Sequence, residues 1–239
     1  MRGLKGVLDF LYPKRCPICE NIVMPKGNLI CRGCFEQLPF VIEPCCKKCG
    51  KPLGSVEKEY CYDCEKRTFH YEMGYGLWIY DEKMKRSISA FKYRGKREYA
   101  EFYGQQLLNR YKKWIMSMGI QVIIPVPIHS KKLRTRGYNQ ARLLADIVGK
   151  GMGIPVEEVL ERSINTRPQK VLDNKERIYN LQHAFGLNSL NKFTIEGKRV
   201  LLIDDIYTTG STIEVCSNEL LEAGADKVYF LCLCIGKGF

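Results

Sequence analysis

Two adjacent carboxylates followed by a hydroxyl-rich loop form the part of this 239-residue sequence that is best suited to chemistry. Asp204 and Asp205 come directly after residues 200–203, an apolar run that predicts a strand buried on both faces. The loop consists of Thr208, Thr209, Gly210, Ser211 and Thr212. It leads into residues 211–222, whose pattern predicts an amphipathic helix. The segment therefore predicts a strand, a polar loop and a helix in that order.

The end of a buried strand and the start of a helix are both places where ligands bind. Open α/β sheets bind ligands at the carboxyl ends of their strands. A helix N-terminus offers free backbone N–H groups and the positive end of the helix dipole to a phosphate. A sugar phosphate would use both halves, with its hydroxyls on the acids and its phosphate in the loop. The alternatives are an acidic strand end that binds Mg²⁺ and an ordinary polar turn.

Cysteines are concentrated at the start of the chain, where nine of the twelve precede residue 65. Eight of them form the Cys-x-x-Cys pairs Cys16/Cys19, Cys31/Cys34, Cys46/Cys49 and Cys61/Cys64. This spacing lets both thiolates face one metal ion, and two such pairs complete a tetrahedral Zn²⁺ site. Because successive pairs are separated by the same step of twelve positions, we expect two tandem four-cysteine modules with two structural zinc ions. An interleaved pairing is the alternative, and Cys45 is left over as a packing residue or a backup ligand.

Disulfides are the competing fate of these cysteines, and they would require an oxidising compartment. The first twelve residues have a basic start, but Asp9 interrupts the apolar stretch and no small-residue cleavage site follows. This pattern predicts an amphipathic helix rather than a signal peptide. No segment approaches the ~18 apolar residues of a bilayer span. We therefore expect a cytoplasmic protein without a membrane span, in which the thiols stay reduced.

The formal net charge is +12, from 38 basic and 26 acidic side chains. It falls to about +8 when eight thiolates bind two zinc ions. Two basic segments interleaved with aromatic residues contribute Lys92, Arg94, Lys131, Lys132, Arg134 and Arg136. Cations beside aromatic rings are typical of surfaces that bind pyrophosphate or the phosphates and bases of a nucleic acid. A solvated loop is the alternative for residues 131–140.

Residues 1–68 and 69–239 differ in pattern, and we expect a small zinc-binding region followed by a larger α/β domain. In the second part, β-rich or apolar runs predict strands at residues 74–80, 121–125, 199–204 and 228–235. Amphipathic patterns predict helices at residues 82–93, 99–118, 139–148 and 211–223. Strand–helix–strand units of this spacing predict a parallel sheet. Residues 161–186 are polar and lack periodicity, which predicts a long loop that acts as a lid.

The order of residues from 200 to 212 resembles the phosphoribosyl pyrophosphate (PRPP) motif of type I phosphoribosyltransferases. Further segments occur in the order that is typical of one family. They are the cysteine pairs, Phe91-Lys92-Tyr93-Arg94-Gly95, Pro125-Val126-Pro127, Arg136-Gly137-Tyr138-Asn139-Gln140, the set Thr166, Gln169, Arg177 and Asn180, Ala184-Phe185 and the motif itself. With these segments, essentially the whole chain resembles the ComF (ComFC) family, amidophosphoribosyltransferase-like proteins associated with natural competence.

The resemblance implies a type I phosphoribosyltransferase-like fold, an open parallel sheet flanked by helices that follows the cysteine-rich region. By the same resemblance, Asp204 and Asp205 would hold the ribose hydroxyls of PRPP, and residues 208–212 would hold its 5′-phosphate in the presence of Mg²⁺. The family further implies a role in handling incoming single-stranded DNA in the cytosol, with DNA-uptake or helicase machinery as partners.

One departure from purine-salvage relatives concerns the loop. Those enzymes have an Asp that assists proton removal at the position that resembles Thr208, so the sequence offers no obvious general base there and no catalytic residue is assigned. We expect PRPP and DNA binding as the function. The alternatives are an active phosphoribosyltransferase of nucleotide metabolism and a PRPP-responsive regulator that binds duplex DNA.

Overall fold

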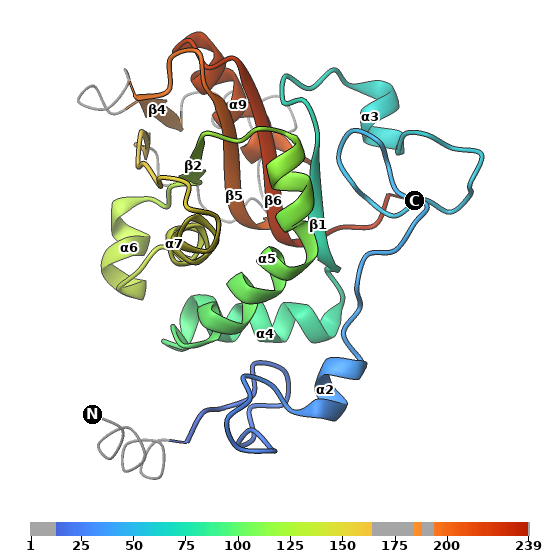
Figure 1. Cartoon of the computed structure of the whole chain (residues 1–239), viewed down its shortest axis with the longest axis vertical. Helices are drawn as coiled ribbons and strands as arrows, with labels where there is room; N and C mark the ends of the chain where they lie inside the picture. Colours follow the sequence, from blue (N-terminus) through green and yellow to red (C-terminus); the bar gives the residue numbers. More distant parts are fainter. Residues whose placement is uncertain (1–12, 164–183, 188–193, 239) are drawn as a thin grey trace, which may run out of the picture.

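A four-stranded parallel sheet with the strand order β1-β6-β5-β2 forms the centre of the computed structural model, which describes residues 13–163, 184–187 and 194–238 (Figure 1). The strands are β1 (Gly74–Ile79), β2 (Val122–Pro125), β5 (Arg199–Tyr207) and β6 (Lys227–Ile235). A separate antiparallel pair consists of β3 (Leu160–Arg162) and β4 (Phe185–Leu187). The predicted parallel sheet is confirmed.

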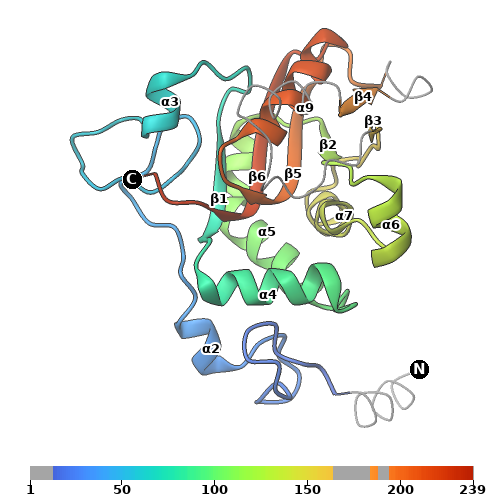
Figure 2. The same ribbon diagram turned by 180° about the vertical axis from the view of Figure 1, so that it is seen from behind.

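Helices cover both faces of the central sheet, which explains why its strands are apolar on both sides. The helices α4 (Glu82–Tyr93), α5 (Tyr99–Ser117) and α7 (Gln140–Met152) lie over one face, and α9 (Ser211–Glu222) lies over the other (Figure 1 and Figure 2). Residues 200–203 of β5 and 230–235 of β6 have no exposed surface. The core of the protein therefore lies on the two faces of these strands.

Local sequence signals set the ends of the helices beside the sheet. Asp81 caps α4 by accepting a hydrogen bond from the Met84 backbone N–H at 2.8 Å. Asn139 caps α7 in the same way, through the Ala141 N–H at 3.0 Å. Gly153, with a φ of 69°, ends α7 in the left-handed conformation that glycine adopts without strain. Helix α4 has the bounds that the sequence predicts. Helix α7 continues beyond the predicted end at residue 148, because its C-cap is Gly153.

Two segments have more regular structure than the sequence predicts. Strand β5 does not end at Asp204 but continues to Tyr207, because Ile206 and Tyr207 pair with β6. The apolar run alone does not reveal this extension. The basic segment, for which a solvated loop is the alternative interpretation, begins with a short helix, α6 (Ser130–Arg136). His129 accepts from the Lys131 N–H at 3.1 Å where α6 begins, and Gly137 ends it.

The predicted lid falls partly outside the described residues. Its two ends are not loop, because Leu160–Arg162 and Phe185–Leu187 pair as strands. Residues 164–183, and the predicted helix in residues 1–12, lie outside the part of the chain that the structure describes. None of the helices within the described ranges combines the length and hydropathy that a bilayer span requires.

The cysteine-rich region consists of two separate modules, each with one short helix. We call residues 13–37, with α2 (Arg32–Glu36), the first module, and residues 45–67, with α3 (Tyr62–Lys66), the second module. The first module lies against α4, whereas the second lies beside β1 and close to the end of the chain (Figure 1 and Figure 2). The two modules therefore contact different parts of the larger domain.

Candidate ligand site and metal centres

The two predicted acids lie near the carboxyl end of β5, where the chain changes the side of the sheet on which its helices pack. Helix α7 precedes β5 on one face, and α9 follows it on the other. Such a switch point opens a crevice at the strand ends. Asp205 Oδ1 lies 2.8 Å from Lys92 Nζ, with only 13% and 18% of the two side chains exposed. Asp204 Oδ1 accepts from the Asp205 backbone N–H at 2.8 Å.

The electrostatic surroundings of the site act on the pKa of Asp204 and on that of Lys92. Burial and the neighbouring Asp205 charge raise the pKa of Asp204 to about 7, although Lys92 and Arg162 act in the opposite direction. Burial alone would lower the pKa of Lys92, but Asp205 and Asp204 outweigh it and raise that pKa above its ordinary value. Lys92 is therefore a charged ammonium group held beside the acid pair. A ligand hydroxyl at Asp204 would meet a carboxyl group that titrates near neutral pH.

The predicted phosphate loop joins β5 to the N-terminus of α9. Gly210 has a φ of 80° and is the N-cap of α9, while Thr208 and Thr209 are exposed. A Cβ atom at Gly210 would lie 2.5 Å from Tyr207 Oη, so no larger residue fits without a shift. Thr209 Oγ1 and Ser211 Oγ form a hydrogen bond of 3.0 Å. Because the first N–H groups of a helix lack intrahelical acceptors, this loop has the geometry of an anion site.

Four cations influence one another beside the acid pair, on which Lys92 and Arg162 act directly, and we call them the cationic rim. They are Lys92, Lys132, Arg136 and Arg162. Burial lowers the pKa of Lys132, and the positive charges of Arg162, Arg136 and Lys92 lower it further. Arg136 also lies over the exposed ring of Tyr93, with its Cζ 4.7 Å from the ring centroid, and donates to Tyr93 Oη at 3.1 Å. Concentrated positive charge of this kind attracts a polyanion.

The six predicted basic residues divide into three groups. Lys92, Lys132 and Arg136 belong to the cationic rim. Lys131 and Arg134 are exposed on α6, the helix that also contains Lys132 and Arg136. Arg94 instead forms an ion pair with Glu20 of the first module. In this structure Arg94 therefore attaches the module, while the contact of these residues with a ligand stays a prediction.

Arg162 is a rim residue that the sequence reasoning did not assign to the site. It lies in β3, and its Cζ is 4.9 Å from the centroid of the Phe185 ring in the partner strand β4. Burial lowers its pKa, whereas the charge of Asp204 raises it. The available signal is weak, because Arg162 stands in a polar stretch and its position depends on strands of three residues each.

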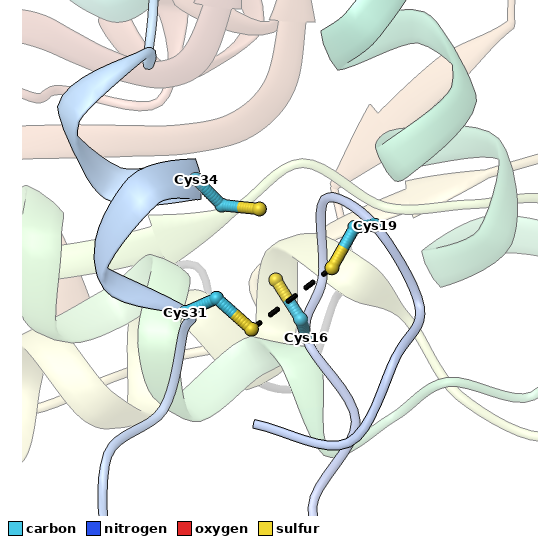
Figure 3. A group of neighbouring side chains, drawn as sticks. All are labelled: Cys16, Cys19, Cys31 and Cys34. Carbon is cyan, nitrogen blue, oxygen red and sulfur yellow. Dashed lines mark hydrogen bonds between the residues drawn. The ribbon is translucent and has the colours of Figure 1, made fainter. Parts of the chain in front are cut away.

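The sulfur atoms of the cysteines form two groups, and each group brings together consecutive pairs. The groups are Cys16, Cys19, Cys31, Cys34 and Cys46, Cys49, Cys61, Cys64. Within each, all sulfurs lie within 4.8 Å of one another. A tetrahedral zinc ion with Zn–S bonds of about 2.3 Å requires sulfurs about 3.8 Å apart. The observed separations of 4.0 Å for Cys19–Cys31 and 3.5 Å for Cys49–Cys61 fit this geometry, so the sequential pairing is confirmed (Figure 3).

The ninth cysteine of the region is not a member of either group. The Cys45 thiol donates to the Ile42 carbonyl at 3.2 Å, and burial raises its pKa to about 11. A thiol that remains protonated is a poor metal ligand. Of the two expectations for Cys45, packing is therefore the one that the structure favours.

Two parts of the chain match known protein families. Residues 7–65 match the double zinc ribbon domain, and residues 135–238 match the phosphoribosyl transferase domain. The zinc ribbon match contains all eight cysteines of the two groups, and the transferase match contains the acid pair and the phosphate loop. The zinc ribbon match thus agrees with the zinc binding predicted for the cysteine groups, and the transferase match agrees with the sugar phosphate site predicted at the end of β5.

Curated proteins from several bacteria match nearly the whole chain. Competence protein F of Haemophilus influenzae is 29% identical over 223 residues, which cover 90% of this chain and 93% of that protein. Competence protein ComFC of Bacillus subtilis is 28% identical, covering 84% and 82%. DNA utilization protein YhgH of Escherichia coli K12 is 26% identical, covering 93% and 97%. The chain thus combines a double zinc ribbon with a phosphoribosyl transferase domain, and it is similar over most of its length to these competence and DNA utilization proteins.

Proposed function

We propose that the protein binds PRPP with Mg²⁺ at the end of β5 and binds single-stranded DNA on the adjoining basic surface, as an accessory of natural competence in the cytosol. The observation that carries the PRPP assignment is the arrangement of three features at one strand end. Asp204 and Asp205 precede a loop whose glycine caps α9, and Lys92 contacts the second acid at 2.8 Å. A ribose 5-phosphate group needs acceptors for its hydroxyls and an anion site for its phosphate, and this strand end offers both.

Each part of the site has one task in this proposal. The carboxylates of Asp204 and Asp205 accept hydrogen bonds from ribose hydroxyls, and the loop N–H groups of residues 208–212 receive the 5′-phosphate. The cationic rim faces the diphosphate, whose charge Mg²⁺ neutralises when bound. Oxygen-rich ligands are what Mg²⁺ prefers, so the acid pair fits that ion. Thr208 provides no carboxylate for proton transfer, and we therefore propose binding without assigning turnover.

The DNA assignment is supported by an exposed aromatic ring among cations. The Tyr93 side chain is 67% exposed and lies beneath Arg136, with Lys131 and Arg134 on the same short helix as Arg136. Stacking rings and cations are the elements by which proteins bind single strands without sequence preference. The names of the relatives, competence proteins and DNA utilization proteins, agree with this use of the surface.

Calorimetric titration tests the ligand site. We expect PRPP with Mg²⁺ to bind the wild-type protein, and the double variant Asp204→Asn with Asp205→Asn to lose that binding. Asp226→Asn is a matched control, because Asp226 is a half-exposed acid that pairs with Arg199, the first residue of β5, far from the loop. Absence of PRPP binding by the wild-type protein would refute the proposal. Product formation with a base or amine acceptor would favour the enzyme alternative.

Fluorescence anisotropy with labelled oligonucleotides tests the DNA surface. We expect affinity for a single strand that falls as salt rises, because cations displace counterions from phosphates. The double variant Lys131→Glu with Arg134→Glu should weaken this affinity, whereas Lys112→Glu with Lys113→Glu on α5 should not. Preference for a duplex would favour the regulator alternative, and equal binding by both variants would contradict the assigned surface.

A further inference from the structure

A three-residue segment after the second module, Phe69-His70-Tyr71, joins that module to the phosphate loop, and we call it the strap. It begins five positions after Cys64, the last cysteine of the module. The rings of Phe69 and Tyr71 stack with centroids 5.2 Å apart. Between them, His70 contacts α9. The strap thus places consecutive side chains on the two elements that flank the phosphate loop.

The inner contact of the strap is made with Tyr207, the residue directly before the loop. Tyr71 Oη and Tyr207 Oη are 2.7 Å apart, and both side chains are buried. Tyr207 stacks on Phe230 of β6, with centroids 4.7 Å apart and an interplanar angle of 2°. The loop then passes over this ring, because a Cβ at Gly210 would lie 2.5 Å from Tyr207 Oη and 3.2 Å from Phe69 Cε1. The loop therefore rests on a surface that the strap completes.

The outer contact of the strap is made with the first turn of α9. The His70 backbone N–H donates to Glu214 Oε2 at 2.9 Å, and the His70 ring contacts the other oxygen of the same carboxylate. Glu214 N in turn donates to the Gly210 carbonyl at 2.8 Å. The strap therefore fixes both the residue before the loop and the helix after it.

The second module also reaches this aromatic surface directly. Lys51, two positions after Cys49, is 4% exposed and places its Nζ 5.7 Å from the centroid of the Tyr207 ring. The same ammonium donates to Asp63 Oδ2 at 2.7 Å, a residue between Cys61 and Cys64. Lys48 Nζ lies 5.4 Å from the centroid of the Tyr71 ring. Both cysteine pairs of the module therefore determine where the cations and the strap lie.

We propose that Tyr71 and His70 are positioning residues for the phosphate loop, and that the zinc ion of the second module fixes them, so that ribose 5-phosphate binding depends on that ion. Zinc would be held by Cys46, Cys49, Cys61 and Cys64, whose spacing fits it. Without the ion the strap loses its anchor, and the loop loses the surface on which it rests. The proposal rests on the proposed ligand site, and it concerns only the phosphate end of that site.

Tyr71→Phe is the most direct test, because it removes only the hydroxyl group that contacts Tyr207. We expect affinity for ribose 5-phosphate, measured by calorimetry, to fall about tenfold, since the buried Tyr207 hydroxyl is left without its partner. Tyr103→Phe is the matched control, a buried tyrosine whose hydroxyl contacts Ser87 on the opposite face of the sheet. It should change the affinity by less than about twofold. His70→Ala, at a side chain that is 55% exposed, should leave folding intact and weaken binding in the same direction.

The outcomes separate this inference from the ligand site itself. If the wild-type protein did not bind ribose 5-phosphate, both the proposed ligand site and the positioning role would be refuted. Normal wild-type binding with equal affinity for Tyr71→Phe and His70→Ala would refute only the positioning role. An equal loss in Tyr71→Phe and Tyr103→Phe, accompanied by an equal fall of the melting temperature, would indicate general destabilisation and would also refute it. Zinc analysis of each variant should still find two ions per chain, as the two cysteine groups predict.

Discussion

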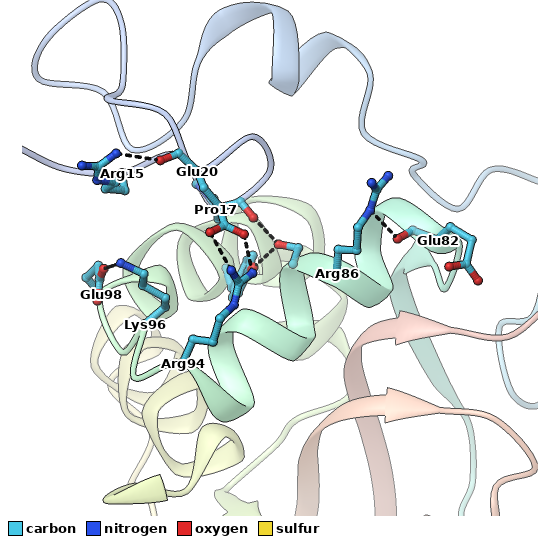
Figure 4. A network of polar contacts seen from close by, with 10 residues as sticks. Arg15, Pro17, Glu20, Glu82, Arg86, Arg94, Lys96 and Glu98 are labelled. Atoms are coloured by element: carbon cyan, nitrogen blue, oxygen red, sulfur yellow. Dashed lines mark hydrogen bonds and ion pairs between the residues drawn. The ribbon is translucent and has the colours of Figure 1, made fainter.

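The two cysteine modules share the same spacing of ligands but have different surroundings. In the first module Cys19 is exposed, whereas in the second Cys46, Cys49 and Cys61 are all buried. The first module contacts helices of one face, with the Ser87 hydroxyl donating to the Pro17 carbonyl and Arg94 paired with Glu20 (Figure 4). The second contacts the strap and the base of the phosphate loop. Ligand spacing thus predicts the metal, while the packing of each module decides what the metal supports.

Loss of a ligand in each module is the change with the largest expected effect on this comparison. We expect Cys61→Ser to release one zinc ion, because a structural zinc site is closed by four protein ligands and this variant leaves three. It should also abolish measurable ribose 5-phosphate binding. Cys19→Ser should release the other ion and leave the ligand affinity within about threefold of the wild-type value. Metal analysis and calorimetry on both variants provide the measurement, and equal losses of ligand affinity would remove the distinction between the modules.

The order in which zinc leaves the wild-type protein gives a second comparison. A thiol-alkylating reagent should release zinc in two phases, since access governs the reaction of cysteine ligands. We expect the first phase to modify Cys19, the exposed ligand, and the second to modify Cys61, which is 1% exposed. Mass spectrometry of the alkylated cysteines would assign the phases. Ribose 5-phosphate binding should survive the first phase, and its loss there would contradict the separate roles.

The contacts of the first module should affect stability without affecting the ligand site. Ser87→Ala removes the hydroxyl that contacts Pro17 and Tyr103, and it should lower stability by about 1–2 kcal/mol. For a chain of this size that corresponds to a melting temperature lower by about 2–8 °C. Ser117→Ala is the control, because that hydroxyl lies on an exposed surface and donates to the Trp114 carbonyl of its own helix. A loss of ligand affinity in Ser87→Ala would show that the first module also acts on the site.

Sequence reasoning predicts the elements of this protein better than the contacts among them. The apolar runs and amphipathic patterns reproduce β1, α4 and α9, because these depend on neighbouring residues. Equal spacing of the cysteine pairs predicts two zinc sites but leaves the pairing open. The position of Arg162 depends on two short strands that are far apart in the sequence. The strap escapes notice for the same reason, since Tyr71 and Tyr207 are 136 positions apart and meet only in the folded chain.

The smallest expected effect is a change of melting temperature in a variant at Asp204. The proposed ligand needs this carboxylate, whereas its burial destabilises the fold. Burial and Asp205 raise the pKa of Asp204 to about 7 from an ordinary value of 3.8. Between these values the folded protein binds more protons than the unfolded chain, so stability falls as pH rises towards 7 and is constant above it. Asp204→Asn does not titrate, and we therefore expect a melting temperature about 2–4 °C above the wild-type value at pH 8 and a smaller difference at pH 5.5.

Calorimetric melting of Asp204→Asn at the two pH values provides the measurement, with Asp226→Asn as a control at a half-exposed acid that pairs with Arg199. Since the contacts of both modules are kept in this variant, the pH dependence isolates the acid pair from the zinc centres. A gain that is the same at both pH values would contradict the assigned cause. A gain at pH 8 that coincides with lost PRPP binding would show that the buried carboxylate is retained for the ligand, because it destabilises the fold that holds it.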